Sequence, residues 1–414
     1  MAINKFVLEN GLRVVHQMDT TSPMVVINTL YDVGSRDEHP DHTGFAHLFE
    51  HLMFGGSVHI PSYDDPVQRA CGEDNAWTCS DFTNYYLMLP SCNAEVGFWL
   101  ESDRMLSLDF SQQSLDVQRN VVCEEFKQRN LNQPYGDVSH LMRGMAFHHH
   151  PYAWPTIGKE LSHIENATLE EVRSFFFSYY APNNAILSVV GDISLEETKR
   201  LVEKWYGDIP RRDVRTRAIP PEPKQTEPRR MEVERNVPAD LICRVYHVCG
   251  RLEPDYYTSD VISDVLSNGT SSRLYRKYVK ENSLFTELNA YITGDIETGL
   301  FYLTGLLSDG VTFEQAEQAF DAEVKRLCDE LVPDDELEKV KNKYEAAQLQ
   351  DNMTLLKRAN NLAYYELLGD ANLMHEDVRR YRAVTAADVW RYAREVFVPE
   401  NSSTLIYRKS GAKN

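Results

Sequence analysis

Hydrophobic and polar positions follow two different periods along the chain. Leu12–Val15 and Val25–Tyr31 are apolar or alternating runs of strand length near the N-terminus. Asp335–Gln348, in contrast, repeats its apolar residues at the spacing of an amphipathic helix. Each half of the chain begins with strand runs and continues into helix runs. This order predicts α+β domains with largely antiparallel sheets.

Two distant segments repeat the same series of structural signals. Thr168 with Glu171 has the pattern of a helix N-cap, and an aromatic helix then ends at Pro182 before an apolar strand. Thr385 begins a second helix in the same way, which ends at Pro399 before another apolar strand. Thr and Pro are fourteen positions apart in both copies, and the copies are offset by 217 positions. The sequence therefore predicts two homologous domains in tandem.

The segment between the two copies is rich in proline. Four prolines among residues 218–228 exclude helix and disfavour a central strand, which is typical of a linker. The alternative is a long surface loop within one domain. We predict a catalytic domain over residues 1–217, a linker over 218–230 and a homologous non-catalytic domain over 231–414.

Composition narrows the class of protein. The chain has 414 residues and a net charge of −20, so its average surface repels nucleic acid and anionic membranes. No apolar run reaches the length of a membrane span. The seven cysteines lack paired CxxC spacing and are expected to be free thiols. The N-terminus lacks a secretory pattern, so we expect a cytoplasmic protein, or a periplasmic one if a leader precedes this sequence.

One short segment has the pattern of a metal site. His47 and His51 are four residues apart, so on a helix both imidazoles lie on one face and can bind a single ion. Glu50 lies near that face and can reach a water activated by zinc, take its proton and deliver it to a leaving amine. The alternative is a solvated helix face with two ordinary histidines. Apolar residues surround the three polar ones: Phe45, Leu48, Phe49, Leu52 and Met53.

A third ligand is expected from a carboxylate on another helix. Residues 121–126 contain Glu124 and Glu125. Glu125 is four residues from Val121 and three from Val122, so it is predicted to share their buried face, whereas Glu124 is rotated away. The competing cluster is His148–His150, but consecutive residues point in different directions, and we expect a packing or solvated role there.

Beside these motifs, the chain resembles the inverted-motif zinc peptidases of the insulinase, pitrilysin and mitochondrial processing peptidase group. The resemblance rests on the H-x-x-E-H helix, on V-V-x-E-E about seventy residues later, and on residues 72–78, 83–85, 150–152, 182–184 and 269–274. It implies that His47, His51 and Glu125 bind Zn²⁺ and that Glu50 is the general base. Mn or Co remains an alternative metal.

The resemblance also implies a substrate site. Asn75, Ala76, Trp77 and Thr78 match a strand that lies at a sheet edge beside the zinc and pairs with the backbone of the substrate. Such β-augmentation holds an extended peptide through main-chain hydrogen bonds. Without the resemblance, this segment is an ordinary strand after a glycine turn.

The second half departs from the pattern of active relatives. Only two of the thirteen histidines follow the linker, so this half cannot rebuild the zinc site. Val279 and Thr286 occupy the places where active members commonly have an Arg and a Tyr near the substrate. Gln118 stands where relatives often have a Glu. The chain therefore resembles the zinc-bearing member of a pair of paralogous subunits.

Together these features predict a zinc metalloendopeptidase that hydrolyses extended or unfolded peptides. Its two domains are expected to form half of a clam-shell chamber, in a homodimer or in a dimer with a paralogue that carries the missing Arg and Tyr. The alternative is a non-catalytic assembly subunit or peptide-binding subunit of the same family. Inactive relatives of that kind commonly lose a ligand or the base, and all four residues are present here.

Overall fold

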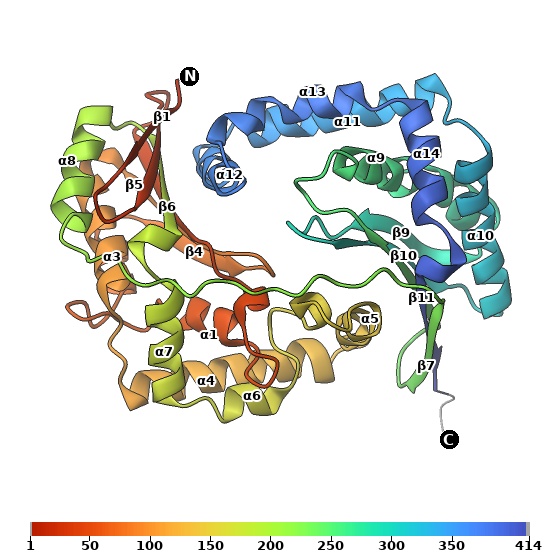
Figure 1. Cartoon of the computed structure of the whole chain (residues 1–414), viewed down its shortest axis with the longest axis horizontal. Helices are drawn as coiled ribbons and strands as arrows, with labels where there is room; N and C mark the ends of the chain where they lie inside the picture. The colour runs from red at the N-terminus through yellow and green to blue at the C-terminus, as the bar shows by residue number, and fades with distance from the viewer. Residues whose placement is uncertain (1, 411–414) are drawn as a thin grey trace. The chain divides into compact units, whose positions relative to one another are not determined.

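The computed structural model describes residues 2–410. The chain forms two compact units (Figure 1). The first unit comprises Met1–Gln128, Trp154–Ile219 and Leu349–Glu376, and the second comprises Arg129–Ala153, Pro220–Gln348 and Asp377–Asn414. Each unit thus includes a segment from the opposite half of the sequence. The division into domains over residues 1–217 and 231–414 stays a prediction. The clam-shell chamber stays a prediction as well.

The first unit contains a six-stranded sheet in the order β1-β2-β6-β3-β5-β4. The only parallel pair among these described strands is β2 with β6, and the other neighbours are antiparallel. Strand β4 lies at the edge and pairs with β5. The strands are β1 (Asn4–Val7), β2 (Arg13–Met18), β3 (Met24–Tyr31), β4 (Glu73–Thr78), β5 (Thr83–Pro90) and β6 (Ala185–Gly191).

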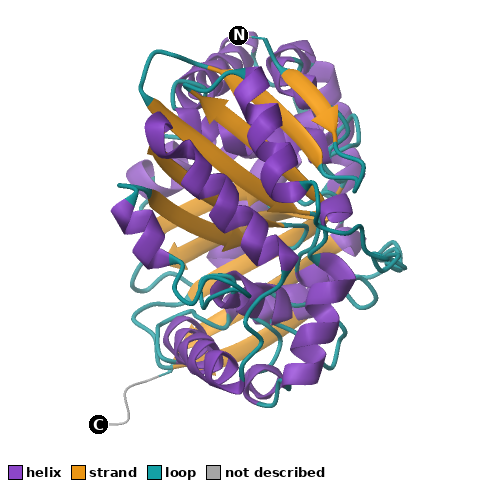
Figure 2. Ribbon diagram, turned by 90° about the vertical axis from the view of Figure 1, so that its left-hand side faces the viewer, coloured by secondary structure: helices purple, strands orange, loops and turns teal. Residues whose placement is uncertain are grey.

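Both faces of this sheet are covered by helices. Val25 and Ile27 of β3 point into the main core, whereas Val26 and Leu30 pack under α12 (Leu355–Leu367), which the second half of the sequence supplies. Figure 2 shows helices lying across the strands. The other α-helices of this unit are α1 (Phe45–Leu52), α2 (Asp64–Arg69), α3 (Ala94–Leu106), α4 (Gln112–Phe126), α6 (Leu161–Glu165), α7 (Leu169–Tyr179) and α8 (Leu195–Tyr206).

The second unit has a five-stranded sheet in the order β7-β11-β8-β10-β9. Its strands are β7 (Arg229–Arg235), β8 (Leu241–Val248), β9 (Phe285–Ile292), β10 (Gly299–Leu307) and β11 (Ser402–Lys409). Helix α5 packs on one face of the sheet, and α9 and α14 pack on the other. The helices are α5 (Val138–Ala146), α9 (Tyr256–Ser267), the π-helix η6 (Tyr275–Glu281), α10 (Phe313–Asp329), α11 (Asp334–Asp351), α13 (Asp377–Ala383) and α14 (Ala386–Val396).

The two sheets confirm the predicted duplication. Strand β11 is parallel to β7, as β6 is to β2, and the remaining pairs are antiparallel in both sheets. Helices α7 and α14 both begin with a capping box, at Thr168 and at Thr385, and both lead through a 3-10 turn into β6 or β11. The fold class is therefore α+β with two homologous, mostly antiparallel sheets.

Other sequence predictions can be compared with the structure directly. Residues 218–226 form no helix or strand, but β7 begins at Arg229, so the last two residues of the predicted linker are strand. The seven cysteines are free thiols, as predicted. Within residues 2–410, no helix is both long enough and apolar enough to cross a bilayer.

Candidate metal centre

Helix α1 carries the H-x-x-E-H motif, and a buried carboxylate fixes where it begins. Gly44, its N-cap, has φ of 87°, a left-handed conformation that favours glycine. The backbone N–H groups of Gly44 and Ala46 each donate to Glu38 at 2.9 Å, and the indole of Trp154 donates at 3.0 Å. Burial raises the pKa of Glu38 to about 8, although these hydrogen bonds oppose the rise.

Sequence reasoning missed Glu38. The available signal was an acidic residue upstream of a helix that has no side-chain cap at its N-terminal glycine. The residues between Glu38 and α1 form no helix, so the number of residues between them does not predict that Glu38 contacts the start of α1.

The apolar face of α1 packs as predicted. Phe45, Leu48, Phe49, Leu52 and Met53 are all buried in the main core of the first unit. This packing fixes the rotation of α1 and places His47 and His51 together on the opposite side. Their ring centroids are 5.0 Å apart, with the planes at 86° to each other.

Glu125 of α4 lies against both histidines. Its Oε2 atom is 3.7 Å from Nε2 of His47 and 3.3 Å from Nε2 of His51. The three possible ligand atoms lie within 4.8 Å of one another, the only such group of three or more His, Cys, Asp or Glu residues found among residues 2–410.

This donor set fits zinc. Two ligand atoms that are each about 2.1 Å from a tetrahedral ion lie roughly 3.4 Å apart, close to the spacing seen here. Two imidazoles and one carboxylate are also a common ligand set of catalytic zinc, which leaves a fourth position open. The assignment of these residues as ligands remains a prediction, and the geometry supports it.

The neighbouring carboxylate does not join the cluster. The side chain of Glu124 is 64% exposed and pairs with Lys127 at 2.8 Å. The prediction that Glu125 shares a buried face with both valines is wrong for Val121, which is 46% exposed, whereas Val122 is fully buried. The buried face of α4 follows Leu115, Val122 and Phe126, and Glu125 lies at its margin.

Glu50 contacts the predicted substrate strand. The Thr78 hydroxyl on β4 donates to Oε2 of Glu50 at 2.7 Å. Because β4 is an edge strand, the backbone of Asn75, Ala76 and Trp77 borders one strand only within the described sheet. The fold thus brings the candidate base and the candidate peptide-binding strand together.

The second histidine cluster has the packing or solvated role that the sequence predicts, because His150 is buried and His148 and His149 are exposed. The His150 ring bonds to Glu297 at 2.8 Å, and its Nδ1 accepts from the backbone N–H of Tyr152. The backbone N–H groups of all three residues in His148–His150 donate to the Glu222 carboxylate. This contact anchors the proline-rich segment.

Three residues differ from those that active relatives commonly have, and the structure shows where each of them lies. Val279 lies on η6 and packs against the core of the second unit. Thr286 is exposed on the edge strand β9, where its hydroxyl donates to the Leu306 carbonyl at 3.4 Å. Neither offers a cation or a phenol. Gln118 lies beside Gly55, just after α1: a Cβ at Gly55 would be 3.6 Å from the Gln118 amide nitrogen.

The fold and this cluster define a class, the two-unit α+β proteins with an inverted H-x-x-E-H motif. The sequence model of "Insulinase (Peptidase family M16)" matches residues 13–160, and that of "Peptidase M16 inactive domain" matches residues 166–344. The chain belongs to peptidase family M16, the insulinase family.

Relatives extend over nearly the whole chain. It is 27% identical to the zinc protease PqqE of Helicobacter pylori over 97% of this chain and 91% of that protein. It is 24% identical to the uncharacterized zinc protease YmxG of Bacillus subtilis, covering 98% of each. The crystal structure of a protease from Helicobacter pylori matches with a TM-score of 0.92 and 26% identity over 98% of this chain and 99% of that one. These names support a zinc peptidase.

Proposed function

We propose that this protein is a zinc endopeptidase that hydrolyses extended or unfolded peptides. The observation that carries the proposal is the cluster of His47, His51 and Glu125, with Glu50 adjacent to it on the same helix and bonded to an edge strand. Names of relatives as zinc proteases support the same conclusion.

His47, His51 and Glu125 would hold the zinc ion. Zinc bound there supplies a Lewis acid that polarises a carbonyl and lowers the pKa of water to about 7. Glu50 then accepts the proton of the attacking water and returns it to the nitrogen of the leaving amine. The Thr78 hydroxyl holds the Glu50 carboxylate in one orientation.

The substrate would add a strand to the sheet beside β4. An extended peptide can pair with the backbone of Asn75–Thr78, because this strand borders β5 on its other side. Main-chain hydrogen bonds require no particular side chain, so selectivity for sequence is expected to be low at the positions so bound. A tightly folded protein cannot present such a strand.

We further propose that the chain acts in a dimer. A homodimer or a heterodimer would satisfy this proposal. The argument for a heterodimer rests on Val279 and Thr286. Because neither side chain supplies a cation or a phenol, a paralogous subunit would contribute the Arg and the Tyr that hold the scissile bond.

The deciding experiment measures metal content and cleavage of a quenched unstructured peptide together. The purified protein is expected to contain about one zinc per chain and to lose activity with a chelator. Glu50→Gln should keep the zinc and lose cleavage by at least about 100-fold, because the ligands remain while the proton acceptor is gone. Zinc without cleavage under any condition would favour a peptide-binding subunit, and absence of both would favour an assembly subunit.

A further inference from the structure

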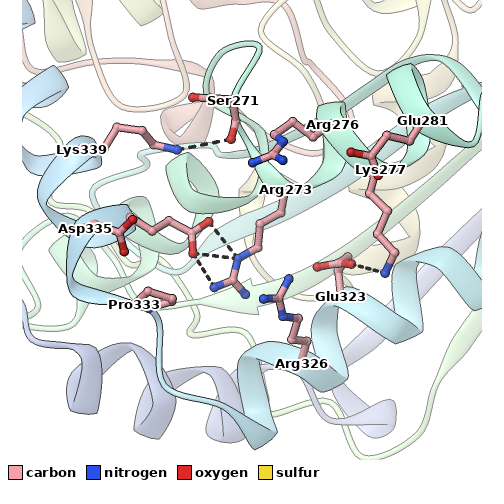
Figure 3. Close-up of a pocket in the computed structure, with 11 residues that line it drawn as sticks. Ser271, Arg273, Arg276, Lys277, Glu281, Glu323, Arg326, Pro333, Asp335 and Lys339 are labelled. Carbon is pink, nitrogen blue, oxygen red and sulfur yellow. Dashed lines mark hydrogen bonds and ion pairs between the residues drawn. The ribbon is translucent and has the colours of Figure 1, made fainter.

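A pocket of about 500 Å³ in the second unit gathers cationic side chains. It is lined by residues that surround η6, α10 and the start of α11. Five of its eleven lining residues are cations, Arg273, Arg276, Lys277, Arg326 and Lys339, although acidic residues outnumber basic ones in the chain as a whole. Figure 3 shows these side chains around the pocket.

Two of the five cations are neutralised inside the protein. Arg273 forms a bidentate pair with Glu336, with distances from 2.6 to 3.1 Å, and the side chain of Glu336 is only 17% exposed. Lys277 donates to the buried Glu323 at 2.8 Å. Glu336 and Glu323, the two least exposed acids of the pocket, are therefore both paired with a cation.

The other three cations have weak or no acidic partners. Arg326 pairs with Glu330, whose side chain is 63% exposed, so solvent screens this pair strongly. Lys339 donates only to the carbonyl of Ser271, at 3.4 Å. Among the described residues, the Arg276 guanidinium forms no ion pair. Glu281 and Asp335 are exposed acids at the same pocket.

A buried donor without an acceptor marks the centre of the pocket. The Arg273 side chain is 94% buried, and its Nη1 atom has no hydrogen-bond partner among the described residues. In Figure 3 the guanidinium groups of Arg273 and Arg326 point toward one another. Arg273 uses Nε and Nη2 on Glu336, so its Nη1 group can donate to an oxyanion that also accepts from Arg326.

We propose that this pocket binds a small ligand that carries a phosphate or a carboxylate group, held by Arg273, Arg276 and Arg326. Guanidinium groups match both oxyanions because their donors lie in one plane and bind two oxygens at once. The volume exceeds that of a single phosphate, so an organic part of the ligand fits as well. The site is independent of the proposed peptidase activity, since none of its residues belongs to the metal centre.

Calorimetric titration of the zinc-loaded protein at constant ionic strength tests the proposal, with inorganic phosphate and citrate as separate probes. The double variant Arg276→Gln/Arg326→Gln should weaken binding by at least about tenfold for each lost cation. Both side chains are substantially exposed, so the variant should fold, which circular dichroism checks. Asp335→Asn removes a repulsive charge and should strengthen binding.

A matched control carries the same change in net charge elsewhere. Lys325→Gln/Arg200→Gln removes two exposed helical cations that do not line the pocket, and it should leave the affinity unchanged. Binding of phosphate alone identifies a phosphoryl ligand, and binding of citrate alone identifies a carboxylate ligand. Affinity for neither probe, or affinity that the pocket variant and the control change equally, would overturn the proposal. Phosphate that binds at the metal centre instead of the pocket would bind the pocket variant and the control equally well, and this outcome would overturn the proposal too.

Discussion

The hydroxyl of Thr78 donates a hydrogen bond to the carboxylate of Glu50, with an oxygen–oxygen distance of 2.7 Å. This contact joins the edge strand β4 to the helix that carries the zinc motif. A hydrogen bond from a hydroxyl on a strand holds an ionised carboxylate in one orientation. Strand position and base position are therefore coupled.

The first prediction concerns this coupling. Thr78→Val has nearly the same shape but removes the hydroxyl, so the carboxylate of Glu50 loses an orienting partner. We expect kcat for peptide cleavage to fall by about tenfold, with unchanged zinc content. Thr78→Ser keeps the hydroxyl and should restore most of the rate. Equal rates for the Val and Ser variants would show that the hydrogen bond has no part in catalysis.

The second prediction separates the two adjacent glutamates of α4. Glu125→Gln should lower zinc affinity by at least about tenfold, because the amide is a poorer ligand than a carboxylate. Glu124→Gln is the matched control, since its exposed side chain contacts Lys127 and should leave zinc binding unchanged. Competition with a chromophoric chelator measures both affinities. The reverse order of effects would show that the ligand assignment is wrong.

The third prediction concerns Glu38, which accepts from the N-terminal backbone N–H groups of α1. Glu38→Ala leaves these donors buried and unpaired, and we expect it to reduce the free energy of unfolding by about 2–3 kcal/mol. Zinc affinity should fall as well, because the same helix carries His47 and His51. Ser194→Ala removes the side-chain cap of α8 and serves as the control, which should lose stability but not zinc affinity. Zinc affinity that is equal in the two variants would contradict a positioning role of Glu38.

The fourth prediction concerns the attachment of α12 to the first sheet. Arg358 of α12 pairs with Asp19, which follows β2, and both residues are buried. The Thr21 hydroxyl and Arg358 lower the pKa of Asp19 from 3.8 to about 2. A carboxyl whose pKa is lower in the folded state stabilises the fold above its unfolded pKa and loses this effect as pH falls toward 2.

Asp19→Asn should therefore reduce the free energy of unfolding at pH 7 by about 3 kcal/mol, because the buried Arg358 loses its ion pair with the Asp19 carboxylate. The difference from the unmodified protein should shrink as pH falls from 4 to 2. Denaturant unfolding across this range measures it. Asp116→Asn breaks an exposed pair with Arg119 and should cost less than about 1 kcal/mol. A destabilisation by Asp19→Asn that does not vary with pH would contradict the role of the ion pair.

The last prediction tests the proposed partner. If Val279 and Thr286 leave the substrate without a charged clamp, the isolated chain should cleave peptides slowly. Addition of a paralogue that lacks H-x-x-E-H but carries the Arg and the Tyr should raise kcat/KM by about 100-fold, since misplacement by ~1 Å can cost this much. Full activity of the isolated chain, unchanged by such a paralogue, would exclude the heterodimer.

Much of the fold and of the metal cluster follows from local patterns in the sequence. The capping boxes at Thr168 and Thr385, each followed by a proline turn and a strand, are short-range features, and the structure reproduces them. His47 and His51 share one helix, so helical geometry alone places them together. The choice of Glu125 over Glu124 also followed from helical rotation, even though Val121 proved to be exposed.

Contacts between distant segments depended on the tertiary structure. Three such contacts are the exchange of α5 and α12 between the units, the hydrogen bond from Thr78 to Glu50, and the cap that Glu38 provides. No periodic pattern in the sequence relates the residues that these contacts join. The cationic pocket likewise unites η6, α10 and α11. Periodicity records which face of an element is buried, but the partner that covers this face is set by packing among all elements at once. The sequence by itself therefore determined the elements and the zinc motif, and the tertiary structure alone decided what surrounds them.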